Sequence, residues 1–202
     1  MQPRIPIRQL TAISLLVATA AAVRVAMNWL ALALVVPIYG VFVKIGLSEA
    51  LTFTSGFAFG PVQGFVTGFL TIVVSDLFTW SGIWTPFIAA IVALIGLVAG
   101  IIRRFKMNPS TRFLGVSAIA LITTSEVLQN VWFGWYMWSF YLPETSFSTV
   151  LAASLVDGLP SMITSVASNT LLFTIVVPRI LRILKEWIPL SDKDSPNRGG
   201  NT

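Results

Sequence analysis

The sequence predicts an all-α polytopic membrane protein with six transmembrane helices in one compact bundle. Three observations support this fold class. The 202 residues are 55% hydrophobic and only 10% charged, the chain contains long apolar stretches, and its basic residues sort to one side of the membrane. Because a soluble domain has about 25% charged residues, this chain lacks the polar groups that would cover a soluble surface. We expect one transmembrane domain over 1–188 and a polar, disordered cytoplasmic tail over 189–202.

A helix that spans the membrane needs roughly 20 mostly apolar residues. Prolines and polar clusters mark the boundaries of six helical stretches. The first stretch is longer than the apolar part of a signal peptide, so we expect a retained helix. It ends before Pro37, and residues 35–46 are expected to form a loop or re-entrant segment. Pro61 begins the third stretch, because a first helical turn tolerates proline. The predicted helices are 9–34, 47–60, 61–79, 85–103, 113–139 and 147–185, with connections at 80–84, 103–112 and 141–146.

The distribution of basic residues predicts the orientation in the membrane. With six spans, the basic segments before the first helix, between the fourth and fifth, and after the sixth all fall on one side. The positive-inside rule makes this side cytoplasmic, together with both termini. Lys44 is the only basic residue in the sequence expected on the opposite side. The tryptophans expected near the outer boundary are Trp80, Trp84, Trp135 and Trp138.

Missing residue types narrow the chemistry. The sequence has no cysteine and no histidine, which removes thiol nucleophiles and the commonest metal ligand and general base. We therefore expect no thiol catalysis, no metal and no cofactor. The net charge of +5 is explained by membrane topology, so no nucleic-acid partner is expected.

The stretch "SGFAFGPVQGFVTG" (55–68) contains a glycine every four residues and a proline in its middle. Gly56 and Gly60 fall on the predicted second helix, whereas Gly64 and Gly68 fall on the third. The pattern predicts a tight helical hairpin with close backbone contact, which turns at Gly60–Pro61 on the cytoplasmic side. Packing alone would account for these glycines.

The longer stretch "KIGLSEALTFTSGFAFGPVQGFVTGFLTIVVSDLF" (44–78) resembles the second and third helices of S components of energy-coupling-factor (ECF) transporters. These membrane subunits bind a vitamin or another micronutrient. The matching features are "LSEAL", the Gly-Pro hairpin and "SDLF". The resemblance implies a multi-pass plasma-membrane protein that captures its substrate from outside and does no chemistry. It also implies three partners, a T subunit and two ATPase subunits.

A ridge of small residues on the first helix is a second matching feature. S components resemble each other in an A-x-x-x-A motif that packs against the T subunit, and here Ala18, Ala22 and Ala26 fit it. The alternative is an interface within the bundle. Arg24 lies about 160–200° around the helix from Ala22 and Ala26. If the ridge faces a partner, Arg24 faces the interior, where it can be paired.

Polar residues inside the predicted helices mark a candidate pocket, because a charge in a membrane helix costs a few kcal/mol. Asp157, Ser161, Ser165 and Asn169 recur every four residues, as do Glu126 and Asn130, and we expect both stripes to face the interior. Pro160 predicts a kink or local unwinding. The alternative is that these groups satisfy one another as structural contacts. The predicted substrate-binding residues are Glu49, Glu126, Asn130, Trp132, Trp135, Asp157 and Asn169.

Carboxylates beside tryptophans suit a cationic or flat heteroaromatic ligand. This favours thiamin or a thiamin precursor, while riboflavin, cobalamin and queuosine-precursor substrates remain open. Two other functions are also open. One is a stand-alone secondary transporter or channel. The other is an intramembrane enzyme that uses Glu126 and Asp157, although the missing histidine and cysteine leave it few catalytic arrangements.

Overall fold

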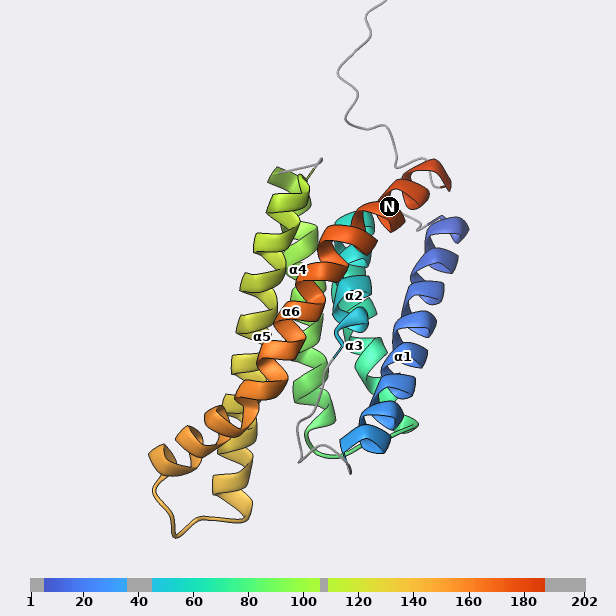
Figure 1. Ribbon diagram of the computed structural model, residues 1–202. Helices are drawn as coiled ribbons and strands as arrows, with labels where there is room; N and C mark the ends of the chain where they lie inside the picture. Colours follow the sequence, from blue (N-terminus) through green and yellow to red (C-terminus); the bar gives the residue numbers. More distant parts are fainter. Residues whose placement is uncertain (1–5, 36–44, 106–108, 188–202) are drawn as a thin grey trace, which may run out of the picture.

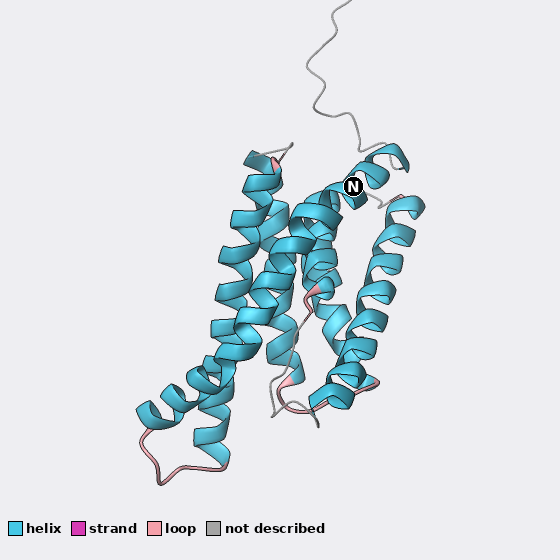
Figure 2. Cartoon of the chain, viewed as in Figure 1, coloured by secondary structure: helices cyan, strands magenta, loops and turns pink. Residues whose placement is uncertain are grey.

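The computed structural model describes residues 6–35, 45–105 and 109–187, which form six helices and contain no strand. Figures 1 and 2 show that the helices form a bundle. Each helix boundary lies within two residues of its predicted position. Most of the predicted re-entrant segment and the predicted disordered tail lie outside the described residues. The helices are α1 (Ile7–Val35), α2 (Leu47–Phe59), α3 (Pro61–Leu77), α4 (Thr85–Phe105), α5 (Thr111–Phe140) and α6 (Phe147–Trp187).

The helices differ in how much of a membrane they can cross. Within the described residues, α1, α4, α5 and α6 are long and apolar enough to span a bilayer. The α3 helix is apolar but shorter, with 17 residues. The α2 helix has only 13 residues, or about 20 Å at 1.5 Å per residue, against a hydrocarbon core of about 30 Å. It therefore covers only part of the membrane depth.

The turn between α2 and α3 has the expected local cause. Gly60 has a φ of +115°, in a region that side chains with a Cβ rarely adopt. Pro61 follows as the first residue of α3, where its missing N–H removes no helical hydrogen bond. The Nη1 of Arg103 in α4 donates to the backbone oxygen of Ala58. It thereby satisfies one of the carbonyls that the end of α2 leaves free.

Glycines join α2, α3 and α4 in one close contact. A Cβ added at Gly56 would overlap the backbone oxygen of Gly96, and one added at Gly64 would overlap both Gly56 and Gly96. Nearer the turn, a Cβ at Gly100 would overlap Pro61. The predicted hairpin with close backbone contact is therefore confirmed. The structure adds that α4 is part of the same contact.

The α2 helix lies at the centre of the bundle, and every residue from Ser48 to Phe59 is buried. Its aromatic side chains form the middle of the apolar core. Phe53 packs on Phe173 of α6 with ring centroids 4.7 Å apart and on Phe57 at 5.9 Å. Around them lie buried residues of α1, α4 and α5. Because α2 is enclosed, its polar side chains depend on partners inside the protein, and the Oγ1 of Thr52 has none among the described residues.

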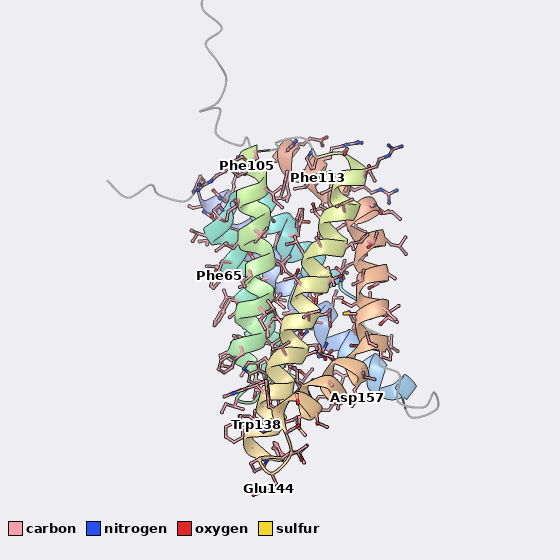
Figure 3. The ribbon with its side chains drawn as sticks, turned by 90° about the vertical axis from the view of Figure 1, so that its left-hand side faces the viewer. Phe65, Phe105, Phe113, Trp138, Glu144 and Asp157 are labelled. Carbon is pink, nitrogen blue, oxygen red and sulfur yellow. The ribbon has the colours of Figure 1, made fainter. Side chains whose placement is uncertain are left out.

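The described chain begins and ends at the same end of the bundle, next to the connection between α4 and α5 (Figure 1). Phe105 and Phe113 lie at this end, whereas Trp138 and Glu144 lie at the opposite end (Figure 3). The basic residues of α4, α5 and α6 therefore gather at one end of the molecule, as the sequence predicts. We call it the basic end.

Candidate functional site

A buried polar cluster links α5 to α6. Glu126 is 4% exposed, and its Oε1 accepts a hydrogen bond from the Oγ of Ser165 at 2.9 Å. The backbone oxygen of Ser165 accepts from the Nδ2 of Asn169 at 3.0 Å. Asn169 is fully buried, and its Oδ1 has no hydrogen-bond partner among the described residues. The predicted stripes on α5 and α6 thus meet at Glu126, Ser165 and Asn169.

Asn130 extends this cluster by one turn along α5. Its Nδ2 donates to the backbone oxygen of Glu126 at 2.9 Å, and its own backbone oxygen accepts from Ser154 of α6 at 2.8 Å. Opposite it lies Gly158, where an added Cβ would overlap the Asn130 side chain. The small residue on α6 leaves the space that the amide occupies.

The start of α2 closes the cluster from a third direction. A Cβ at Gly46 would overlap the side-chain amide of Asn169, and the Gly46 N–H donates to the Oγ of Ser168 at 3.3 Å. Glu49 lies in the first turn of α2, where the positive end of the helix dipole stabilises a carboxylate. It is 2% exposed and accepts a hydrogen bond from Ser48 at 2.7 Å. Gly46 was not predicted as part of the site, because only the fold brings it to α6.

The aromatic residues of α5 occupy a different face. Trp132 lies about 120° around the helix from Glu126 and stacks on Phe87 of α4 at 4.9 Å and on Tyr136 at 5.4 Å. Its Nε1 is buried and has no hydrogen-bond partner among the described residues. Trp135 is 43% exposed and contacts Trp132 at the edge of this stack. The contacts of the two tryptophans therefore do not place them in the Glu126 cluster.

Asp157 departs from the expectation that its stripe faces the interior, because its side chain is exposed. Four residues advance a helix by about 400°, so each repeat drifts by about 40°. Three repeats separate Asp157 from the buried Asn169, which rotates the acid by about 120° out of the cluster. Of the two outcomes predicted at Pro160, local unwinding does not occur, since α6 is helical without a break through Pro160 and Pro178. The helix instead changes direction near Asp157 (Figure 3).

The acid that pairs with Arg24 is Asp76. The Nη2 of Arg24 lies 3.3 Å from Oδ1 of Asp76, and its Nε donates to Ser75 at 2.9 Å. The other carboxylate oxygen of Asp76 accepts from the Oγ1 of Thr85 at 2.8 Å. This pair joins α1, α3 and the start of α4. Asp76 is thus a structural acid, distinct from the Glu126 cluster.

The small-residue ridge on α1 is open to the surroundings. Ser14, Ala18, Ala22 and Ala26 are all exposed. Beside the ridge, between α1 and α3, is an apolar groove of about 440 Å³. It is lined by Ala18, Ala21, Ala22, Val25, Ala26, Val74 and Phe78. Within the chain as described, these alanines are therefore not buried against another helix.

Comparison with known proteins identifies the family. The model of the family described as "ECF-type riboflavin transporter, S component" matches residues 5–185. No curated protein and no solved structure matches the chain. Because the family match covers most of the sequence, the chain belongs to the S components of ECF transporters.

Membership in this family establishes the general role of the chain. It is the substrate-binding membrane subunit of an ECF importer in the plasma membrane, and it associates with T and A subunits to take up a vitamin. It is not an enzyme, since ATP hydrolysis belongs to the separate A subunits. Nothing favours a stand-alone transporter or channel.

Proposed function

We propose that the chain binds riboflavin at the cluster formed by Glu126, Asn130 and Asn169, with Glu49 in the first turn of α2 as a further substrate contact. The observation that carries this proposal is the fully buried Asn169, whose Oδ1 lacks a partner. A buried acceptor without a hydrogen bond costs about 1–3 kcal/mol, so a ligand N–H or O–H at this position would remove a penalty. The family description supplies riboflavin as the vitamin.

The chemistry of riboflavin fits these groups. Its flat ring system presents N–H and carbonyl groups on one edge, and its side chain carries several hydroxyls. An amide can recognise such an edge because it both donates and accepts, and carboxylates accept hydrogen bonds from hydroxyls. Glu49 and Glu126 can therefore serve an uncharged ligand.

The charges of the site also weaken the argument for a cationic ligand. That argument rests on several buried acids without a partner. Asp76 is paired with Arg24, and Asp157 is exposed. Glu126 and Glu49 each accept a serine hydrogen bond. The prediction of a positively charged substrate, such as thiamin, is untested. Binding of riboflavin would contradict it.

Three of the predicted site residues have less structural support as substrate contacts. Trp132 offers a buried indole N–H and a stacked ring, but on the face of α5 that meets α4. Trp135 and Asp157 are exposed. We therefore place Trp132 at the edge of the proposed site and leave Trp135 and Asp157 outside it.

Calorimetry on the detergent-purified chain tests the proposal. We expect riboflavin to bind and thiamin to bind much more weakly. Glu126→Gln and Asn169→Ala should each weaken riboflavin binding about tenfold or more. A hydrogen bond to a charged group typically contributes ~1.5–3 kcal/mol, and the loss of a buried hydrogen-bond partner has a similar cost. Asp157→Asn is the matched control and should bind like the native chain. Unchanged affinity in both pocket variants, with unchanged melting curves, would place the ligand elsewhere.

We also propose that the ridge of Ala18, Ala22 and Ala26 is the surface that meets the T subunit. Two observations support this: the alanines are exposed, and an apolar groove runs beside them. Small side chains let another helix approach the backbone closely.

A further inference from the structure

We propose that the chain holds one anionic phospholipid of the cytoplasmic leaflet in a second groove, between α1 and α6. This α1–α6 groove has a volume of about 760 Å³, with Leu51 of α2 as part of its wall. It is separate from the groove beside Val74 and from the Glu126 cluster. The lining residues are Ile7, Arg8, Thr11, Ala12, Leu15, Leu16, Thr19, Leu51, Ile180, Ile183 and Leu184.

The groove lining suits a hydrocarbon chain. Apart from Arg8 it contains only aliphatic side chains and two threonines. The Oγ1 of Thr11 donates to the backbone oxygen of Ile7 at 3.0 Å, so its hydroxyl is already satisfied. Leu15 and Ile183 are 63% and 54% exposed, which leaves apolar surface for a ligand to cover.

The length of the groove matches one leaflet. Along α1 the lining runs from Ile7 to Thr19, which is about 18 Å at 1.5 Å per residue. Half of a hydrocarbon core of about 30 Å is about 15 Å. A single acyl chain that enters at the start of α1 would therefore reach the middle of the membrane within this groove.

Positive charge lies where the headgroup would sit. Arg8 lines the mouth of the groove. Arg179 is exposed and directly precedes Ile180, which lines the groove, although Arg179 itself is not part of the lining. Among the described residues in the last turns of α6, Arg182 and Lys185 are exposed, together with the acid Glu186. The balance is positive, which favours a phosphate over a zwitterionic headgroup.

The choice of leaflet rests on the proposed orientation, in which the basic end is cytoplasmic. Anionic lipids attract basic residues at that surface, and basic pockets between transmembrane helices bind anionic headgroups. The charge is the reason to prefer a lipid over a protein helix in this groove. An apolar helix would cover Leu15 and Ile183 equally well but would leave Arg8 and Arg179 without an anion.

Native mass spectrometry of the full chain in detergent tests the proposal. The probes are phosphatidylglycerol and phosphatidylcholine with identical palmitoyl and oleoyl chains, supplied in equal amounts. We expect the native chain to retain phosphatidylglycerol preferentially. Arg8→Gln and Arg179→Gln should each reduce this preference about fivefold, the effect of one cation near an anionic surface. Arg112→Gln is the matched control, because Arg112 lies at the same end on α5 and outside the groove.

A second variant tests the acyl-chain part of the groove. Thr19→Phe fills the groove from an exposed position and should remove retention of both lipids while the melting curve and riboflavin binding stay unchanged. Unaltered riboflavin binding separates this result from a failure of the substrate site. Equal retention of the two lipids by the native chain would overturn the proposal. So would variants that keep lipid but lose the T subunit, because the groove would then be a protein-docking surface.

Discussion

The partly buried ion pair between Arg24 and Asp76 illustrates how single residues connect distant helices. The side chains are 18% and 5% exposed, and Ser75 and Thr85 supply further hydrogen bonds. Removing one partner of such a pair leaves a charge without compensation, which costs more than the pair itself contributes. The pair therefore fixes α1 against α3 and α4.

We predict that Asp76→Asn lowers the free energy of unfolding by about 3 kcal/mol, because Arg24 would keep its charge without an acid. Thermal melting of the detergent-purified chain measures the change. Asp157→Asn is the same substitution at an exposed site and should melt like the native chain. Adding Arg24→Met to Asp76→Asn should recover part of the loss. A native melting curve for Asp76→Asn would show that the pair has no structural role.

The residues of the site could be predicted from the sequence only in part. Charges and amides at helical spacing led us to propose Glu126, Asn130 and Asn169, since polar residues are costly inside membrane helices and mark candidate functional sites. The sequence did not predict which acid pairs with Arg24, because the pairing depends on which helix packs on α1. The prediction that Asp157 faces the interior was wrong, because a four-residue repeat drifts around the helix. Gly46 was not predicted, because it belongs to no periodic pattern.

At the scale of helices, the spacing of residues predicted where each helix lies in the sequence better than it predicted which helices contact one another. The glycines of 55–68 predicted the α2–α3 hairpin, and Gly60 with Pro61 explains its turn. The role of Gly96 was not predicted, because nothing in the sequence says which helix packs across a hairpin. In the same way, the ridge on α1 predicted a small-residue surface, and only the structure shows that it is exposed.

The ridge leads to a prediction about assembly. Ala22→Leu should reduce co-purification of the T subunit about tenfold, since a branched side chain prevents close backbone approach. Riboflavin binding should be unaffected, because Ala22 is not part of the Glu126 cluster. The matched control is Ala120→Leu, a second exposed alanine, on α5. If Ala22→Leu assembled as well as the control, the ridge would not be the T-subunit surface.

For the whole molecule, composition and hydropathy were sufficient to predict six helices in the correct order. They did not predict that α2 is buried along its length, because the hydrophobicity of a 13-residue helix does not say which helices pack around it. Its burial follows from the glycine contact with α3 and α4 and from the packing of Phe53 on Phe173. Close packing of this kind depends on the surrounding helices rather than on the helix itself.

The orientation of the bundle is a further prediction at this scale. Ser110 precedes α5 at the basic end, and Ser146 precedes α6 at the opposite end; both are exposed. The positive-inside rule places the first in the cytoplasm and the second outside. Because the native chain has no cysteine, Ser110→Cys and Ser146→Cys each introduce a single thiol. In intact cells, a membrane-impermeant maleimide should label Ser146→Cys at once and Ser110→Cys only after lysis. Labelling of both from the same side would contradict the six-helix topology, and labelling in the reverse order would place the α1–α6 groove in the outer leaflet.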